Sequence, residues 1–302
     1  MVKSLLWVVL LGACTTAASE PKSNTVPRDE VVAKVPERTP SFSDAEYAEH
    51  IRALRVKLAR RGLDKLNVRI EDPFVVASDG TLAQLERSSK TVRWAADKLE
   101  QDFFTKRPSK ILDIYLFQTA ASYEAGVEAL TGEEPSTPYG FYSSSKGGLF
   151  MNIATGGGTL VHEIVHPYVE ADFPTAPPWL NEGLGSLFEQ SSERDGHIVG
   201  LTNWRLGGIQ KVIQRGETPT IKDLTALTNK QFYDSGTSYG QARYVMYYLQ
   251  EQGLLQKFYA AFRTAHAQDP SGYQTLVSIL GQADMRAFQR RWERFVADLS
   301  FP

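Results

Sequence analysis

The sequence predicts an α+β fold, with a small mixed β-sheet beside a helix that carries a His-Glu-x-x-His motif and a mainly helical lobe after it. Short apolar segments with strand-like alternation are confined to the first half of the chain, before residue 154. From 205 to 295 the pattern is almost wholly helical. At 302 residues the chain is long enough to bury a full core.

The first elements follow from caps and periodicity. Ser43-Asp44-Ala45-Glu46 is a capping-box pattern, which predicts a helix that runs to Arg61-Gly62. Residues 67–78 contain two strand-like segments around Pro73. A long helix follows over 82–104, because its apolar residues recur at helical spacing.

The sheet continues in the next fifty residues. Residues 111–117 predict a strand, and 119–130 predict a helix. Residues 139–142 and 148–153 predict two further strands, joined by the turn-rich segment 143–147.

The chemistry is concentrated in His162-Glu163-Ile164-Val165-His166. Positions i and i+4 of a helix share a face, so both histidines can point at one metal ion. Glu163 lies about 100° round from His162, beside the metal rather than on it. Zinc accepts imidazole and carboxylate ligands, and a catalytic site uses three protein ligands. Glu182 completes the set, and Glu170 is a rival third ligand.

The motif therefore predicts one Zn²⁺ per chain, held by His162, His166 and Glu182. Glu163 would take a proton from the metal-bound water and act as the catalytic base. Pro167 removes a helical hydrogen bond directly after His166, so the helix is expected to kink or end there. The helix that carries Glu182 is expected to begin at Pro178.

These residues resemble the gluzincin metallopeptidases, whose fold is zincin-like. The match lies in His162, Glu163, His166 and the pair Asn181-Glu182, within Trp-Leu-Asn-Glu-Gly. Ser238-Tyr239-Gly240-Gln241-Ala242 looks more like the compact bacterial peptidase MA-like domains. The resemblance covers about 110–260, and only the block from 160 to 190 is highly specific.

The resemblance implies a zinc metallopeptidase with a peptide or protein substrate. It assigns the zinc ligands and the base as above, and it makes Tyr239 the second catalytic residue, which stabilises the oxyanion. It also implies that the strand at 148–153 corresponds to the edge strand that pairs with an extended substrate. Packing is the alternative role for Tyr239. Arg243 is a weaker candidate for substrate binding, with surface charge as the alternative.

Other functions stay open or are disfavoured. A net charge of −2 gives no electrostatic basis for binding nucleic acid. A non-catalytic envelope protein that keeps the fold as a binding module is one alternative, although binding alone does not need Glu163. A zinc amidohydrolase that acts on a non-peptide amide is the other. His50, His197 and His266 have no ligand spacing and are expected on the surface or in packing.

The first residues predict export. Met1-Val2-Lys3 precedes an apolar run over 5–11 that is too short to span a membrane, so residues 1–13 predict a signal peptide. Leu-Gly-Ala-Cys resembles the lipobox of bacterial lipoproteins, which implies lipidation of Cys14 and a membrane anchor at the cell envelope. The alternative is a plain signal peptide that is cleaved near Ala17 or Ala18.

The remaining chain divides at about residue 40. Residues 14–40 hold several prolines among polar residues and predict a flexible tether. Residues 41–302 form the metallopeptidase domain, with an α/β part at about 41–170 and a helical part at about 171–302. Thr15 stands where an aspartate often retains such lipoproteins at the inner membrane, which favours the outer membrane, facing the periplasm.

Overall fold

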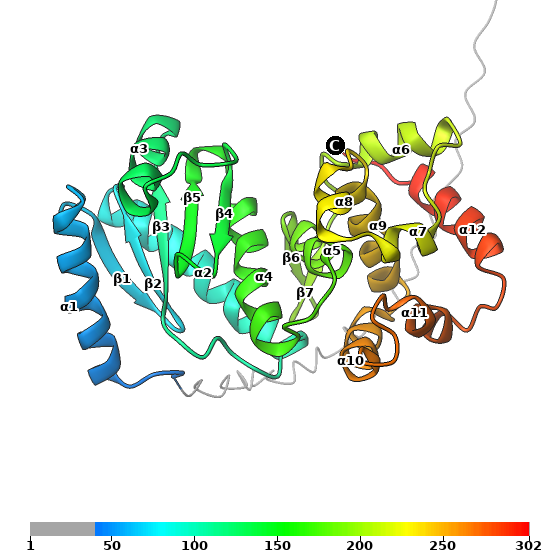
Figure 1. The fold of residues 1–302 in the computed structure, drawn as a ribbon, viewed down its shortest axis with the longest axis horizontal. Coiled ribbons are helices and arrows are strands. Elements are labelled where there is room, and N and C mark those ends of the chain that lie inside the picture. The colour runs from blue at the N-terminus through cyan, green and yellow to red at the C-terminus, as the bar shows by residue number, and fades with distance from the viewer. Residues whose placement is uncertain (1–39, 302) are drawn as a thin grey trace, which may run out of the picture. The chain divides into compact units, whose positions relative to one another are not determined.

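A five-stranded sheet precedes a mainly helical region in the computed structural model, which describes residues 40–301 (Figure 1). The mixed α+β fold with a small mixed sheet and a helical C-terminal part is therefore confirmed. The signal peptide, Cys14 and all but the last residue of the tether lie outside the described residues. No helix within 40–301 combines the length and the apolar character needed to cross a membrane.

Helices and strands alternate in the N-terminal part. They are α1 (Asp44–Arg60), β1 (Asn67–Glu71), β2 (Phe74–Ser78), α2 (Leu82–Asp102), β3 (Leu112–Phe117), α3 (Ala120–Thr131), β4 (Gly140–Ser143) and β5 (Gly148–Asn152). Each was expected from the sequence within two or three residues. The capping box is present at α1, because Ser43 Oγ accepts the Glu46 N–H and the Glu46 carboxylate accepts the Ser43 N–H.

The strand order is β1-β2-β3-β5-β4. The inner pairs β2–β3 and β3–β5 are parallel, whereas β1–β2 and β4–β5 are antiparallel. The expectation that residues 148–153 form the edge strand was wrong, because β5 pairs on both sides. The helix α3 returns the chain to pair β5 with β3, and the short turn before β5 leaves β4 on the outside. The edge beside the site is therefore β4.

The period-two alternation of the strands divides the core between the two faces of the sheet. One face packs against α2 and the helix that follows the sheet, through Val76, Ile114, Leu116, Leu149 and Met151. The other face packs against α1 and α3, through Val75, Ala77, Tyr115, Phe117 and Phe150. The sheet is thus covered on both faces, and one covering helix carries the His-Glu-x-x-His motif.

Two consecutive helices follow the sheet after a short 3-10 turn (Ile153–Thr155): α4 (Gly158–Asp172) and α5 (Pro178–Phe188). The start of α5 at Pro178 is confirmed. The expectation that the helix ends at Pro167 was wrong, because α4 continues to Asp172. Proline removes one hydrogen bond, to the Glu163 carbonyl, but Tyr168 and Val169 after it are buried in the core. Their packing maintains the helix across the missing bond.

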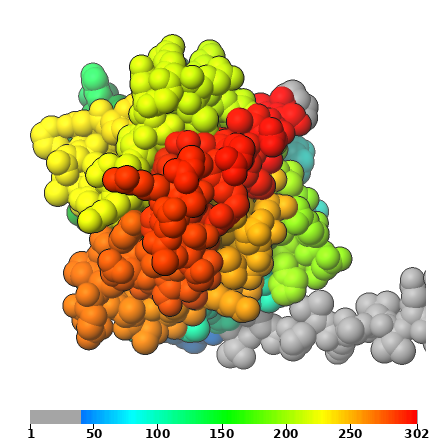
Figure 2. Space-filling model, turned by 90° about the vertical axis from the view of Figure 1, so that its right-hand side faces the viewer, coloured from blue at the N-terminus to red at the C-terminus, as the bar shows by residue number. Residues whose placement is uncertain are grey.

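A hairpin and seven helices complete the chain. They are β6 (Ser191–Arg194), β7 (His197–Gly200), α6 (Leu206–Gln214), α7 (Ile221–Ala226), α8 (Asn229–Asp234), α9 (Ser238–Glu251), α10 (Leu255–Ala265), α11 (Tyr273–Leu280) and α12 (Met285–Ala297). Figure 2 shows this helical side, where α12 (red) lies across the surface. The hairpin was not expected, although Asp195-Gly196, both at positive φ, is a typical hairpin turn.

Candidate metal centre

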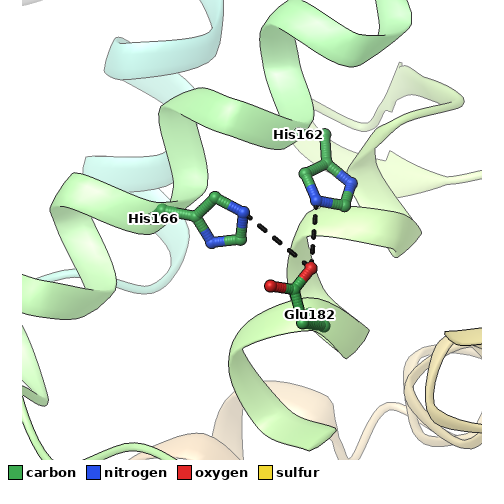
Figure 3. Close-up of side chains that lie close together, drawn as sticks. All are labelled: His162, His166 and Glu182. Carbon is green, nitrogen blue, oxygen red and sulfur yellow. Dashed lines mark hydrogen bonds and ion pairs between the residues drawn. The ribbon is translucent and has the colours of Figure 1, made fainter. Parts of the chain in front are cut away.

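Two helices bring three candidate ligands together. His162 and His166 project from α4 towards Glu182 on α5 (Figure 3). One possible ligand atom from each lies within 4.8 Å of the other two. Glu182 Oε2 is 3.3 Å from His162 Nε2 and 3.9 Å from His166 Nε2. His162, His166 and Glu182 therefore form a buried group that could hold a metal ion, as their sequence spacing predicted.

The helices α4 and α5 approach each other closely, and this contact brings the three residues together. A Cβ on Gly185 of α5 would lie 3.0 Å from His162 Nε2, so glycine leaves room for the imidazole. A Cβ on Gly158, the first residue of α4, would lie 2.2 Å from the Glu189 carbonyl oxygen. Two glycines thus permit the contact between α4 and α5 that brings the ligands together.

Hydrogen bonds from neighbouring residues orient two of the three ligands. His166 Nδ1 is 3.0 Å from Asn181 Oδ1, an acceptor, so Nδ1 carries the proton and Nε2 is free to bind a metal. The Tyr233 hydroxyl donates to Glu182 Oε1 at 2.8 Å, which leaves Oε2 facing the imidazoles. Sequence reasoning missed Tyr233, because it lies 51 residues beyond Glu182 and no spacing pattern connects the two.

Glu163 lies next to the three candidate ligands but is not one of them. Its Oε2 accepts the Tyr142 N–H at 2.8 Å and lies 3.7 Å from His166 Nε2. Burial raises the pKa of Glu163 to about 7; the charge of Glu182 adds to the rise, and His166 and the Tyr142 N–H oppose it. A cation bound nearby would lower this pKa. A carboxylate with a raised pKa beside a metal group is suited to proton transfer.

The pKa of Glu182 is shifted in the opposite direction to that of Glu163. Burial alone would raise its pKa, but in the metal-free protein the attraction of His166, when that imidazole is protonated, and the hydrogen bond from His162 outweigh burial and lower the pKa to about 2. The hydrogen bond from Tyr233 acts in the same direction. The two buried carboxylates therefore differ: Glu182 is held ionised as a ligand should be, whereas Glu163 titrates near neutrality.

The rival ligand Glu170 points elsewhere. Its Oε2 accepts the Tyr142 hydroxyl and its Oε1 accepts the Ser144 hydroxyl, each at 2.7 Å. In the part of the chain that the structure describes, Glu170 belongs to no group that could hold a metal ion. Glu182, and not Glu170, is therefore the residue that lies with the two histidines in a group that could hold a metal ion.

Tyr239 lines the same cleft as the three ligands. Its ring lies 6.3 Å from that of Tyr233 and 5.2 Å from that of Phe232, and the Arg205 guanidinium lies 5.2 Å from it. Burial, together with the charge of Glu182, raises the pKa of Tyr239, so its hydroxyl keeps its proton as a donor. Tyr244 and Tyr248, on the same helix as Tyr239, are buried in the core and do not line the cleft.

Arg243 is fully buried, so its interpretation as surface charge was wrong. Its Nη2 donates to the Leu201 carbonyl, and its guanidinium lies over the Tyr244 ring. It does not line the cleft, because it faces the interior side of α9.

The remaining histidines lie outside the site, as expected. His50 pairs with Asp113, His197 pairs with Asp102, and His266 packs against Phe173 and Phe262.

An open cleft of about 1330 Å³ runs past the metal group. It is bounded by β4, α4 and α5 and by the segments around Trp204 and Tyr233. Three aromatic side chains stand on its rim, with 52% of Tyr139, 59% of Trp204 and 52% of Tyr233 exposed. The cleft is larger than a typical small-molecule pocket of about 300–1,000 Å³. It therefore has room for a ligand larger than a typical small molecule.

Comparison with known protein families and with curated proteins finds no match for this sequence. Two imidazoles and one carboxylate, buried and oriented by Asn181 and Tyr233, fit the ligand set of a catalytic zinc site.

Proposed function

We propose that this protein hydrolyses peptide bonds with one zinc ion, and that its domain is a zincin-like metallopeptidase of the gluzincin type. The observation that carries the proposal is the buried group of His162, His166 and Glu182 with Glu163 beside it, outside the ligand set. A site that only stored a metal would not need this additional buried carboxylate. Its burial is costly, and general base catalysis gives it a use.

The three ligands would hold zinc, which when bound polarises a carbonyl and lowers the pKa of water to about 7. Asn181 fixes the tautomer of His166, and Tyr233 leaves Glu182 Oε2 directed at both imidazoles. These contacts fix the ligand geometry before the metal arrives, so binding requires little reorganisation.

The catalytic work of the chain lies with Glu163. Its carboxylate accepts a proton from the attacking water and delivers that proton to the leaving amine. The Tyr142 N–H holds Glu163 Oε2 at 2.8 Å, which directs the carboxylate towards the space between β4 and the ligands. Tyr239, which lines the same cleft, donates its hydroxyl to the carbonyl oxygen as negative charge develops there.

The exposed edge of β4 supports a peptide as the substrate. An edge strand offers unpaired backbone groups, to which an extended peptide can add as a further strand. The Tyr142 N–H is already donated to Glu163, so a peptide would pair with the other outward-facing backbone groups of β4. β4 forms one wall of the cleft, through Gly140, Phe141 and Tyr142, and the metal group lies beside it. A substrate that pairs with β4 would lie along α4, past Glu163.

Cleavage of a peptide library tests the proposal. Zinc-loaded wild type should cleave peptides, and Glu163→Gln should retain zinc while losing nearly all of the activity, because Glu163 is not a ligand. Cleavage by Glu163→Gln at the wild-type rate would exclude the proposed base. A zinc-loaded wild type that cleaves no peptide would exclude peptide hydrolysis.

We also propose that Cys14 carries lipid and holds the domain at a bacterial cell envelope, facing the periplasm. The support is the sequence alone: the apolar run at 5–11 and the Leu-Gly-Ala-Cys that ends at Cys14. The single cysteine of the chain is Cys14, so no disulfide or other thiol chemistry competes for it.

A further inference from the structure

Glu170 is a carboxylate in the cleft that the proposed reaction does not use. It lies four residues after His166 on α4, so it is one helical turn, about 6 Å, further along the same wall. It lines the cleft, and it is exposed to solvent. A ligand can therefore reach it without any rearrangement of the core.

The carboxylate is held in place and still has acceptor capacity. Tyr142 and Ser144 each donate one hydroxyl to it, at 2.7 Å, one to each oxygen. A carboxylate offers about four acceptor positions, so two remain after these bonds. An ammonium or guanidinium group could use both without displacing Tyr142 or Ser144.

No cation of the described cleft neutralises Glu170. Within residues 40–301, Arg205 is the one lysine or arginine among the cleft-lining residues, and its Nε pairs with Glu189 Oε2 at 3.2 Å. The nearby Lys146 is directed away, because its Nζ contacts the Thr131 carbonyl and Glu133. Glu170 is thus an uncompensated negative charge on the cleft wall.

We propose that Glu170 binds a positively charged group of the substrate, either a lysine or arginine side chain or the free amino terminus. This inference rests on the proposed function and adds its substrate class. An extended peptide advances about 3.3 Å per residue, so the 6 Å between His166 and Glu170 corresponds to about two residues. The cationic group therefore belongs to a residue within about two positions of the cleaved bond.

The test uses the full-length, zinc-loaded chain and two decapeptide libraries. One library carries a single lysine at each position in turn, and the other carries uncharged norleucine at the same positions. Each library is made with free and with acetylated amino termini. Cleavage rates (kcat/KM) are measured by mass spectrometry for wild type, Glu170→Gln and Glu170→Lys. Glu128→Gln, which removes a carboxylate from exposed α3 outside the cleft, is the control.

At one position, wild type should cleave the lysine peptide with a higher kcat/KM than the norleucine peptide. Glu170→Gln should reduce this ratio of kcat/KM values about 3- to 10-fold. Glu128→Gln should leave the ratio unchanged. Glu170→Lys should favour norleucine over lysine at that position, because the two positive charges repel each other.

A preference for free over acetylated peptides in wild type that Glu170→Gln loses would identify the amino terminus as the bound group. A lysine preference that persists in the acetylated peptides would identify the side chain. The proposal would be overturned if wild type preferred neither lysine over norleucine nor free over acetylated amino termini, or if Glu170→Gln kept the wild-type preference.

A binding measurement separates this proposal from the proposed function. The same libraries are passed over immobilised Glu163→Gln and over the double variant Glu163→Gln/Glu170→Gln. Preferential retention of lysine peptides by the first protein only would support the Glu170 site even if wild type cleaved nothing. Equal retention of lysine and norleucine peptides, and of free and acetylated peptides, by both proteins would overturn it even if wild type proved to be a peptidase.

Discussion

Asn181 provides the most direct test of how the metal ligands are oriented. Its Oδ1 accepts the Nδ1–H of His166 and so leaves Nε2 free for a metal. Asn181→Ala should weaken zinc binding about 10- to 100-fold, the usual effect of losing such a partner. Competition with a chelator measures the affinity, and Asn229→Ala at an exposed position of α8 is the control. Equal affinities for both variants would show that Asn181 has no orienting role.

Replacing Gly185 by alanine should favour the helix but weaken zinc binding. Alanine has the higher helix propensity, by about 1 kcal/mol. A Cβ at 185 would nevertheless lie 3.0 Å from His162 Nε2 and displace the imidazole. Gly185→Ala should therefore weaken zinc binding without lowering the melting temperature of the metal-free protein. Gly208→Ala, a helical glycine of α6 with nothing within 4 Å of the added Cβ, should leave zinc affinity unchanged.

Zinc binding by Gly185→Ala at wild-type affinity would show that the ring has room to move.

The sequence predicted the ligands because they follow local rules. His162 and His166 share a helix face by spacing, and Glu182 lies in a recognisable local pattern. The roles of Tyr233 and Arg243 depend on how distant segments fold together. Tyr233 reaches Glu182 from another helix, and Arg243 is enclosed by neighbours that no local pattern reveals.

Among the helices and strands, the errors arose where tertiary packing outweighs local preference. Pro167 indicated a break, yet α4 continues because Tyr168 and Val169, which follow it, are buried in the core. The strands at 140–143 and 148–152 were both expected, but their order in the sheet was not. Which strand lies at the edge depends on the crossover through α3, and spacing along the chain does not determine it.

Asp172, at the end of α4, connects three elements. It accepts hydrogen bonds from Thr105 before β3 and from Tyr259 on α10, and it pairs with Arg263. Asp172→Asn should lower the free energy of unfolding by about 2 kcal/mol, because the charge-assisted bonds are lost. Urea unfolding at pH 7 measures the change, with the exposed Asp64→Asn as control. A loss no larger than that of the control would show that this connection contributes little to stability.

The same carboxylate predicts a pH dependence. Burial tends to raise the pKa of Asp172, but bonds from Thr105, Tyr259 and Arg263 outweigh burial and lower it. A pKa lowered in the folded state adds stability above the unfolded value, near 3.9, and that stability disappears as pH falls through the folded value. The difference between wild type and Asp172→Asn should therefore be full at pH 7 and shrink below about pH 4. A difference that grows in acid would contradict this assignment.

At the scale of the whole molecule, the lipid anchor on Cys14 is a prediction that rests on the sequence alone. Wild type should partition into the detergent phase on fractionation, because a lipidated Cys14 carries it there. Cys14→Ser should appear in the aqueous phase or as uncleaved precursor. Recovery of wild type entirely in the soluble fraction would indicate an ordinary secreted protein instead.

The central claim is that His162, His166 and Glu182 form a zinc site with Glu163 as a base beside it. Elemental analysis of the reconstituted chain from Ser41 onward tests this claim most directly. One zinc per wild-type molecule is expected, with retention in Glu163→Gln and Glu170→Ala and loss in Glu182→Ala. No zinc in wild type, or loss in Glu170→Ala but not in Glu182→Ala, would contradict it.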